Sequence, residues 1–208
     1  TYMETFPAWS PNGKDLYFTR AQGYQKGMSL DSIRYDLCKV SFDSSTEKLG
    51  APEVLFQASA QSKSVSFPCI SPDGKFLMFT LSDYGNFSIW HPESELYLMN
   101  LNSNEIRPLV EVNSDDVDSY HTWSSNGHWF VFSSKRMDGL WARPYFASFN
   151  PETGETGKPF LLPQKDPLFY DNYTYTYNRP ELIKEPVKNG KEFERIISQK
   201  AVQAVGKP

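Results

Sequence analysis

Short runs of large apolar residues alternate with turn residues along most of this 208-residue chain. In the clearest example, the apolar runs Phe67–Ile70 and Phe76–Phe79 flank the tetrapeptide Ser71-Pro72-Asp73-Gly74. Pro fixes one φ angle of a turn, Asp bonds its own backbone, and Gly adopts the positive φ that closes the turn. The pattern therefore predicts two strands joined by a tight turn.

The same pattern occurs three times, in segments that align without a gap. The segments are 6–19, 67–80 and 120–133, and three of their positions hold the same residue type in every copy: Ser10, Ser71 and Ser124; Gly13, Gly74 and Gly127; Phe18, Phe79 and Phe132. A third strand is predicted after each hairpin, at 36–43, 95–102 and 143–150, and a short fourth strand at 52–56, 106–110 and 159–162. Repeated units of four short strands are typical of β-propeller blades.

The turn sequences resemble a known repeat. Trp-Ser-Pro-Asn-Gly-Lys at 9–14, Ile-Ser-Pro-Asp-Gly-Lys at 70–75 and Trp-Ser-Ser-Asn-Gly-His at 123–128 are similar to the PD40, or WD40-like, repeat of TolB-like β-propellers. Segment 132–139 also resembles the usual ending of that repeat, from which the first two copies depart. The resemblance covers residues 1–163 and implies an all-β propeller with three four-stranded blades, at about 1–58, 59–116 and 117–163. Because the motif residues build the turn and the core, they do not specify a function.

A propeller ring closes with roughly four to eight blades, and three blades alone would leave two apolar faces in water. We therefore expect the chain to form part of a six-bladed ring. Either a second copy completes the ring as a homodimer, or the chain is the C-terminal half of a longer propeller. The start at Thr1, close to the first blade, favours a processed or excised N-terminus.

The repeat stops near residue 163, and residues 164–208 form a C-terminal tail. Alternating tyrosines over 173–177 predict a strand with its rings on one face, which covers a blade edge or offers a surface to a partner. From 191 to 205 the apolar positions recur at helical spacing. We expect one short amphipathic helix here, packed on the outer face of the propeller or partly disordered.

Five residues are candidates for a ligand site. Phe6, Phe67 and Tyr120 occupy one repeat position at the start of the first strand, which in TolB-like propellers lies at the mouth of the central channel. His121 replaces the proline of the other copies, and Arg143 stands where they have an acidic residue. A ring of aromatic side chains with one His and one Arg could bind a ligand. Alternatively, the rings pack between blades, His121 bonds a neighbouring backbone and Arg143 pairs with an acid.

The rest of the chemistry is sparse. A net charge of −4 gives no electrostatic case for nucleic acid or an anionic membrane, and no apolar run is long enough to span a bilayer. Cys38 and Cys69 are expected as buried thiols, with a disulfide as the alternative. The acidic segment 111–118 is expected to be solvated, with calcium binding as the alternative. The sequence has no nucleophile elbow, phosphate loop or metal spacing of histidines, so we expect no catalytic residue, cofactor or metal site.

These observations favour a non-catalytic module that binds a protein or a small ligand at the channel mouth. The TolB-like resemblance implies a bacterial, periplasmic protein in an envelope assembly. An enzyme that acts on polysaccharide or peptide is the alternative, with Tyr120, His121 and Arg143 at its site. A third possibility is the ligand-reading domain of a larger regulatory chain.

Overall fold

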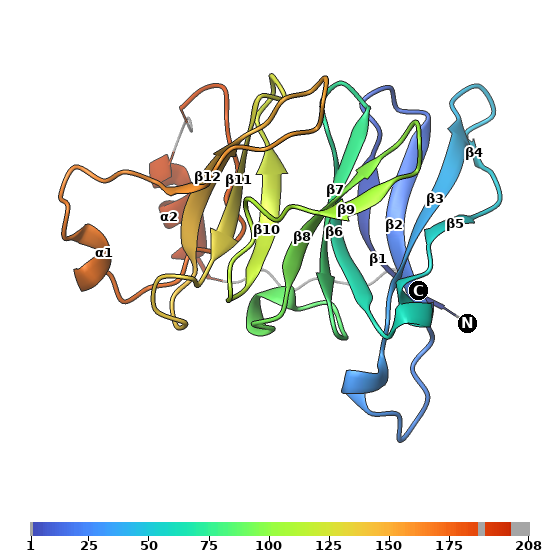
Figure 1. The fold of residues 1–208 in the computed structure, drawn as a ribbon, viewed down its shortest axis with the longest axis horizontal. Coiled ribbons are helices and arrows are strands. Elements are labelled where there is room, and N and C mark those ends of the chain that lie inside the picture. Colours follow the sequence, from blue (N-terminus) through green and yellow to red (C-terminus); the bar gives the residue numbers. More distant parts are fainter. Residues whose placement is uncertain (1, 187–189, 201–208) are drawn as a thin grey trace.

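The computed structural model describes residues 2–186 and 190–200 and contains three antiparallel sheets (Figure 1). The first sheet contains β1 (Tyr2–Trp9), β2 (Asp15–Gln22), β3 (Asp36–Asp43), β4 (Lys48–Leu49) and β5 (Glu53–Phe56). The second contains β6 (Ser64–Ile70), β7 (Phe76–Ser82), β8 (Glu95–Asn100) and β9 (Ile106–Pro108). The third contains β10 (Asp118–Trp123), β11 (Trp129–Ser134), β12 (Arg143–Ser148) and β13 (Phe160–Leu161).

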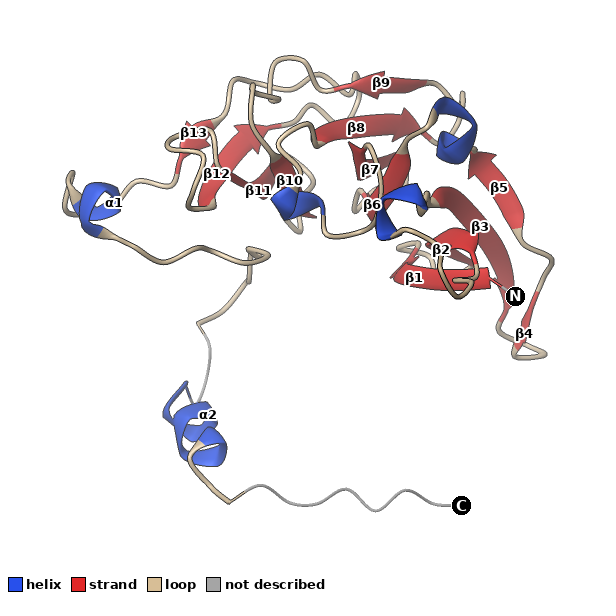
Figure 2. Ribbon diagram, turned by 90° about the horizontal axis from the view of Figure 1, so that it is seen from below, coloured by secondary structure: helices blue, strands red, loops and turns tan. Residues whose placement is uncertain are grey.

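In the second and third sheets the strands follow one another in chain order, whereas in the first sheet β4 and β5 both pair with β3. The three sheets form an arc (Figure 2). The first strands β1, β6 and β10 neighbour one another on the concave side, and the last strands lie on the convex side. Short 3-10 helices occur in the connections between strands: η1 (Leu30–Ser32), η2 (Ala58–Gln61) and η3 (Ser88–Trp90). Two α-helices, α1 (Phe169–Asn172) and α2 (Gly190–Ile197), lie in the C-terminal tail. The arrangement confirms the expected propeller of four-stranded blades with a short C-terminal helix.

The hairpin turns have the chemistry that the sequence predicts. In the second blade the Ser71 hydroxyl donates to Asp73 Oδ1 at 2.6 Å and accepts from the Phe76 amide at 3.0 Å. Gly74 has φ +75°, a region that L-residues with a side chain rarely adopt. Ser10 and Ser124 make the same bonds in the other two blades. This shared turn fixes the register of each hairpin, which explains why the repeats align without a gap.

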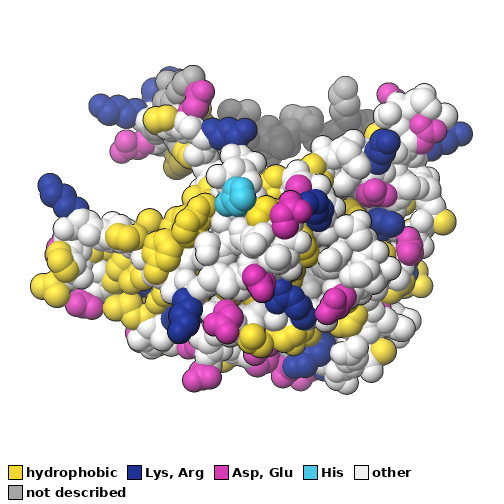
Figure 3. All heavy atoms as spheres, turned by 45° about the horizontal axis from the view of Figure 1, so that its top comes forward, with side chains coloured by type: hydrophobic (Ala, Val, Ile, Leu, Met, Phe, Trp, Pro, Cys, Tyr) yellow, Lys and Arg dark blue, Asp and Glu magenta, His cyan; other side chains and the backbone are white. Residues whose placement is uncertain are grey.

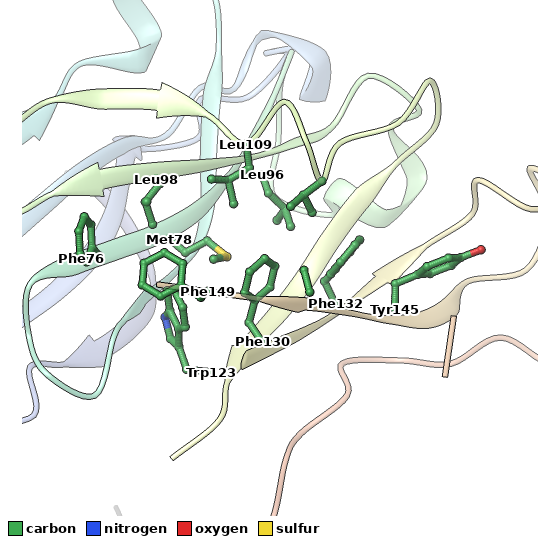
Figure 4. Packing of buried hydrophobic residues seen from close by; sticks show 12 residues of the cluster. Phe76, Met78, Leu96, Leu98, Leu109, Trp123, Phe130, Phe132, Tyr145 and Phe149 are labelled. Carbon is green, nitrogen blue, oxygen red and sulfur yellow. The ribbon is translucent and has the colours of Figure 1, made fainter. Parts of the chain in front are cut away.

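The apolar core lies between the sheets. All seven residues of β7 are buried, because successive side chains point alternately to the first and to the third blade. The interface between the second and third blades contains Phe76, Met78, Leu96, Leu98, Leu109, Val112, Trp123, Phe130, Phe132, Tyr145, Ala147 and Phe149. Figure 4 shows these side chains pointing toward one another from the two sheets. The second blade is therefore buried on both faces, as in the middle of a propeller.

The two ends of the arc differ. On the free face of the first blade, Leu16, Phe18 and Val40 border an apolar groove of about 300 Å³. On the far side of the third blade, Trp129 and Phe160 are 41% and 44% exposed, and Figure 3 shows hydrophobic surface gathered on this side of the molecule. The C-terminal tail also lies against the third blade, as the contacts of Arg143 below demonstrate.

Two predictions for the tail are wrong. Residues 173–177 do not form a strand; they follow α1 as extended loop, and their carbonyl groups bond a side chain instead of a neighbouring strand. The side chains of 191–200 in and after α2 are exposed, including Phe193 and Ile197, so this helix does not pack on the outer face of the propeller. The helix predicted to extend to residue 205 ends at Ile197, and residues 201–205 lie outside the described part of the chain.

Candidate functional site: an aromatic row on the inner strands

A β-bulge occurs at the same place in all three inner strands. In β1 the pair Phe6-Pro7 faces the single residue Phe18 of β2, because the strand pairing shifts between Thr5 and Ala8. The same shift surrounds Phe67 in β6 and Tyr120 in β10. A bulge inserts one unpaired residue and re-aims its side chain. Each blade therefore directs one aromatic residue away from its regular position in the sheet.

The bulged aromatic residues have an unusual backbone. Phe6, Phe67 and Tyr120 have φ values of 54°, 53° and 52°, in the left-handed region. A large side chain is rarely found there, and each such residue costs about 1–3 kcal/mol of stability. The same strained conformation in three blades indicates that the bulge belongs to the repeat.

The bulges bring the three rings together. The ring centroids of Phe6 and Phe67 lie 4.1 Å apart, and those of Phe67 and Tyr120 lie 4.7 Å apart. We call these three side chains the aromatic row. They are half-buried and come from near the middle of the inner strands, so the row lies along the concave side of the arc and not at the strand ends. The guanidinium carbon of Arg179 lies 5.9 Å from the centre of the Phe67 ring.

His121 is enclosed by the protein. Its side chain has no exposed surface, and its Nε2 atom donates to the carbonyl oxygen of Met78 at 3.1 Å. The Nδ1 atom has no hydrogen-bond partner in the described part of the chain. Burial lowers the pKa of His121 to about 3, although the bond to Met78 acts in the opposite direction. The ring is therefore neutral near pH 7 and does not face a ligand beside Tyr120.

We expect His121 to make the protein less stable as the pH falls from 6.5 toward about 3. In this window the unfolded chain binds a proton at the imidazole and the folded chain does not, so stability rises with pH by up to about 1.4 kcal/mol per unit. Urea unfolding at several pH values would measure the slope. The slope of stability against pH should become shallower in His121→Gln. It should stay unchanged in the control His128→Gln, because the His128 side chain is exposed. Equal slopes in both variants would contradict the assignment.

Arg143 binds the C-terminal tail. Its guanidinium donates to the carbonyl oxygens of Tyr170, Tyr173 and Tyr175, at 3.2, 2.9 and 2.8 Å. Asp138 Oδ2 lies 3.6 Å from Nη2, and the side chain is 1% exposed. These partners could not be predicted from the sequence, because backbone carbonyl groups leave no pattern in the residue types.

The acidic segment at 111–118 and the two cysteines are the remaining candidates from the sequence. Asp118 is buried, forms an ion pair with Arg136 and accepts two hydrogen bonds from Ser114. Burial raises the pKa of this carboxyl, and the charge of Arg136 partly offsets the effect. No group of metal-ligating side chains gathers in residues 2–186 and 190–200. Cys38 and Cys69 are free thiols, one fully and one partly buried.

The sequence analysis missed Arg179. It follows the tyrosine-rich segment, and the tail places it beside the inner strands. Ser133 Oγ donates to the carbonyl oxygen of Asn178 at 2.8 Å, and Thr122 Oγ1 donates to that of Pro180 at 2.7 Å. These two bonds fix the backbone on both sides of Arg179 against β10 and β11.

No protein-family model and no curated protein matches the chain. Solved structures do resemble it. Oligogalacturonate lyase in complex with manganese has a TM-score of 0.53 at 15% identity, over 76% of this chain and 41% of the lyase chain. The β-propeller domain of the Trilobed protease from Pyrococcus furiosus has a TM-score of 0.44 at 14% identity, over 79% and 44%. TolB from Acinetobacter baumannii has a TM-score of 0.45 at 20% identity, over 73% and 31%.

The three blades, their shared turns and the interfaces between them define the chain as a partial β-propeller. The propeller structures that it resembles include that of TolB, and the chain spans less than half the length of each of the three proteins named above. None of the described helices has the length and the apolar run that a membrane crossing requires.

Proposed function

We propose that this chain is a non-catalytic propeller module that binds a protein or a small ligand along the aromatic row. The observation that carries the proposal is the row itself. Phe6, Phe67 and Tyr120 keep a strained backbone in all three blades, and their rings are only half-buried on the concave side. Strained residues cluster at binding and active sites, where the surrounding fold maintains them.

Aromatic rings and a nearby cation determine what the site can recognise. Partly exposed aromatic rings bury further apolar area when an apolar or aromatic group packs on them, at a small loss of side-chain entropy. Arg179, beside Phe67, adds a donor for an acidic group. An apolar group next to a carboxylate, as found in many peptides, suits this combination.

The alternative function is an enzyme acting on polysaccharide or peptide in the channel. Of its three candidate residues, His121 is fully buried and Arg143 is engaged by the tail, which leaves Tyr120 as the one that is partly exposed. A general acid or base must reach the proton that it transfers. The enclosure of the other two side chains therefore favours binding over catalysis.

The experiment compares affinity capture by the wild-type chain and by Phe67→Gly from a bacterial envelope extract. Gly removes the ring and also suits φ 53°, so this variant should fold at least as well as Phe67→Ala. We expect a partner that binds the wild type and is lost with Phe67→Gly, and the purified partner should bind the variant about tenfold more weakly or worse, as for a central aromatic contact.

The matched control is Phe87→Gly, which removes an exposed ring from a loop outside the row. Capture should survive this change. A partner that binds Phe67→Gly as well as wild type would refute the proposed site. Turnover of an oligosaccharide or peptide that disappears in Tyr120→Phe would favour the enzyme instead.

We also propose that the module acts outside the cytoplasm in an envelope assembly, as the TolB-like resemblance implies, and that further blades cover the free face of the first blade. The apolar residues Leu16 and Phe18 support this neighbour, because the aligned residues of the second blade are buried at an interface between blades. Light scattering distinguishes whether these further blades come from a second copy of the chain or from the rest of a longer propeller. A mass of twice the chain indicates a second copy, and the mass of one chain indicates a longer propeller.

A further inference from the structure

A second pocket lies on the first blade, at the corner opposite the hairpin turns. It has a volume of about 540 Å³, within the range of small-molecule sites. Its wall contains Tyr2, Arg20, Arg34, Asp36 and Ser59, together with the apolar residues Met28, Ile33 and Val54. The pocket does not include any residue of the aromatic row.

The cations of this pocket retain unused hydrogen-bond donors. The guanidinium of Arg20 lies 4.3 Å from the centre of the Tyr2 ring and makes no hydrogen bond or ion pair with the described residues. Arg34 donates through Nη1 to the carbonyl oxygen of Asp31 at 2.6 Å, its one bond within the described part of the chain. Two guanidinium groups with free N–H groups in one pocket are a suitable site for an oxyanion.

The carboxylate of Asp36 does not neutralise Arg20. Its Oδ1 atom accepts from the Ser59 amide at 2.8 Å, and its Oδ2 atom accepts from the Ser59 hydroxyl at 3.1 Å. Both oxygens are thus held toward η2, and no ion pair joins Asp36 to Arg20 although the two residues are cross-strand neighbours. Among the lining residues are two arginines and one acid, and Glu4, the neighbour of Arg20 on β1, lines the adjacent apolar groove and makes no ion pair with Arg20.

The equivalent corner of the second blade shows whether a neighbouring blade would fill the pocket. Arg20 pairs across the sheet with Asp36, as Leu81 pairs with Glu95 in the second blade. The second blade, which has a blade beside it, still has a pocket of about 310 Å³ at this corner. A neighbouring blade therefore does not have to fill the corner of the first blade.

The charges at these corners also differ. The pocket of the second blade is lined by Glu93, Glu95 and Asp115, with one cation, Lys63. In the third blade, Arg143 stands at the position of Asp36 and Glu95, and its guanidinium is hydrogen-bonded to the tail. Only the first blade combines a pocket at this corner with arginines that have free donors, within the residues that the structure describes.

We propose that the corner pocket of the first blade binds a small organic acid. Its carboxylate lies between the guanidinium groups of Arg20 and Arg34, and its apolar part packs against Met28 and Ile33. The apolar wall selects an organic acid over an inorganic anion, because a bare anion would leave that surface exposed to water. This site is independent of the proposed function at the aromatic row.

Calorimetric titration with phenylacetate, 2-phenylacetamide and inorganic phosphate tests the site. We expect phenylacetate to bind at least about tenfold more tightly than the neutral amide, since each charge-assisted hydrogen bond to an ionised group is strong. Its affinity should exceed that of phosphate and should fall with added salt. Amide chemical shifts of Ala21 and Ser59 should move on binding, which locates the ligand in this pocket.

The variants Arg20→Gln and Arg34→Gln should each weaken phenylacetate binding about tenfold or more. Lys14→Gln, an exposed cation at a hairpin turn, and Phe67→Gly, in the aromatic row, should leave it unchanged. Arg34 lies in a loop, so its variant remains informative if Arg20→Gln unfolds. Unchanged affinity in both arginine variants, equal binding of the amide, or tighter binding of phosphate would overturn the proposal.

Discussion

Replacing Phe130 by Ala is expected to lower the free energy of unfolding by about 3–5 kcal/mol, the range found for large buried aromatic side chains. Phe130 has no exposed surface and lies at the centre of the interface between the second and third blades. Its ring centroid is 5.6 Å from that of Trp123 and 5.9 Å from that of Phe132. Ala would leave a cavity that two rigid sheets cannot collapse to fill.

The adjacent residue provides the control for this prediction. Trp129 precedes Phe130 in β11, points to the opposite face of the sheet and is 41% exposed. Trp129→Ala should cost at most about 1 kcal/mol, as for most surface substitutions. Urea unfolding followed by circular dichroism measures both values without depending on tryptophan fluorescence. Similar losses in the two variants would show that the interface between the blades is not the main source of stability.

Replacing Arg143 by Leu is expected to release the tail and to cost about 3 kcal/mol or more. Three carbonyl oxygens, of Tyr170, Tyr173 and Tyr175, would lose a charged donor that water cannot replace inside the blade. The Tyr177 amide, which donates to the Ala142 carbonyl oxygen at 2.9 Å, should then exchange its hydrogen much faster. Hydrogen exchange and limited chymotrypsin digestion measure the release.

Two further variants separate the hydrogen bonds of Arg143 from its charge. Arg143→Lys keeps the positive charge but lacks the planar fork that reaches several carbonyl groups at once, so its tail should be released partly. Arg195→Leu removes an exposed arginine from α2 and should have no effect on Tyr177 exchange. If Tyr177 remained protected in Arg143→Leu, the contacts of Ala142 and Thr176 would be sufficient to hold the tail.

The blades were predictable from sequence because their information is local. The Ser-x-Asn/Asp-Gly turn is built by residues within five positions of one another, so its recurrence sets each hairpin, and the strands follow within a few residues of the predicted bounds. The repeat position shared by Phe6, Phe67 and Tyr120 correctly identified three equivalent side chains. It could not reveal their left-handed backbone, because a bulge repeated in every copy leaves the alignment without a gap.

What the sequence could not supply depends on contacts between distant segments. Arg143 was noticed as a reversal of charge, but its partners are backbone groups about 30 residues further along the chain. The tyrosines at 173–177 alternate as in a strand, yet the carbonyl groups of Tyr173 and Tyr175 accept hydrogen bonds from Arg143, and none of the described strands pairs with this segment. Arg20 differs from Leu81 and Ser134 at the aligned positions of the other blades. This difference alone did not predict a binding site, because the sequence does not show that Arg20 and Arg34 line the same pocket.

The tail covers one end of the arc and leaves the other end open. Asn178 and Pro180 occupy the side of β10 and β11 on which a following sheet would pack, whereas Leu16 and Phe18 border an open groove at the other end. A sheet can thus be added beside the first blade without breaking any contact described here. Addition beside the third blade would first require the tail to leave. A further sheet would therefore pack beside the first blade more readily than beside the third, where the hydrogen bonds between Arg143 and the tail would first have to break.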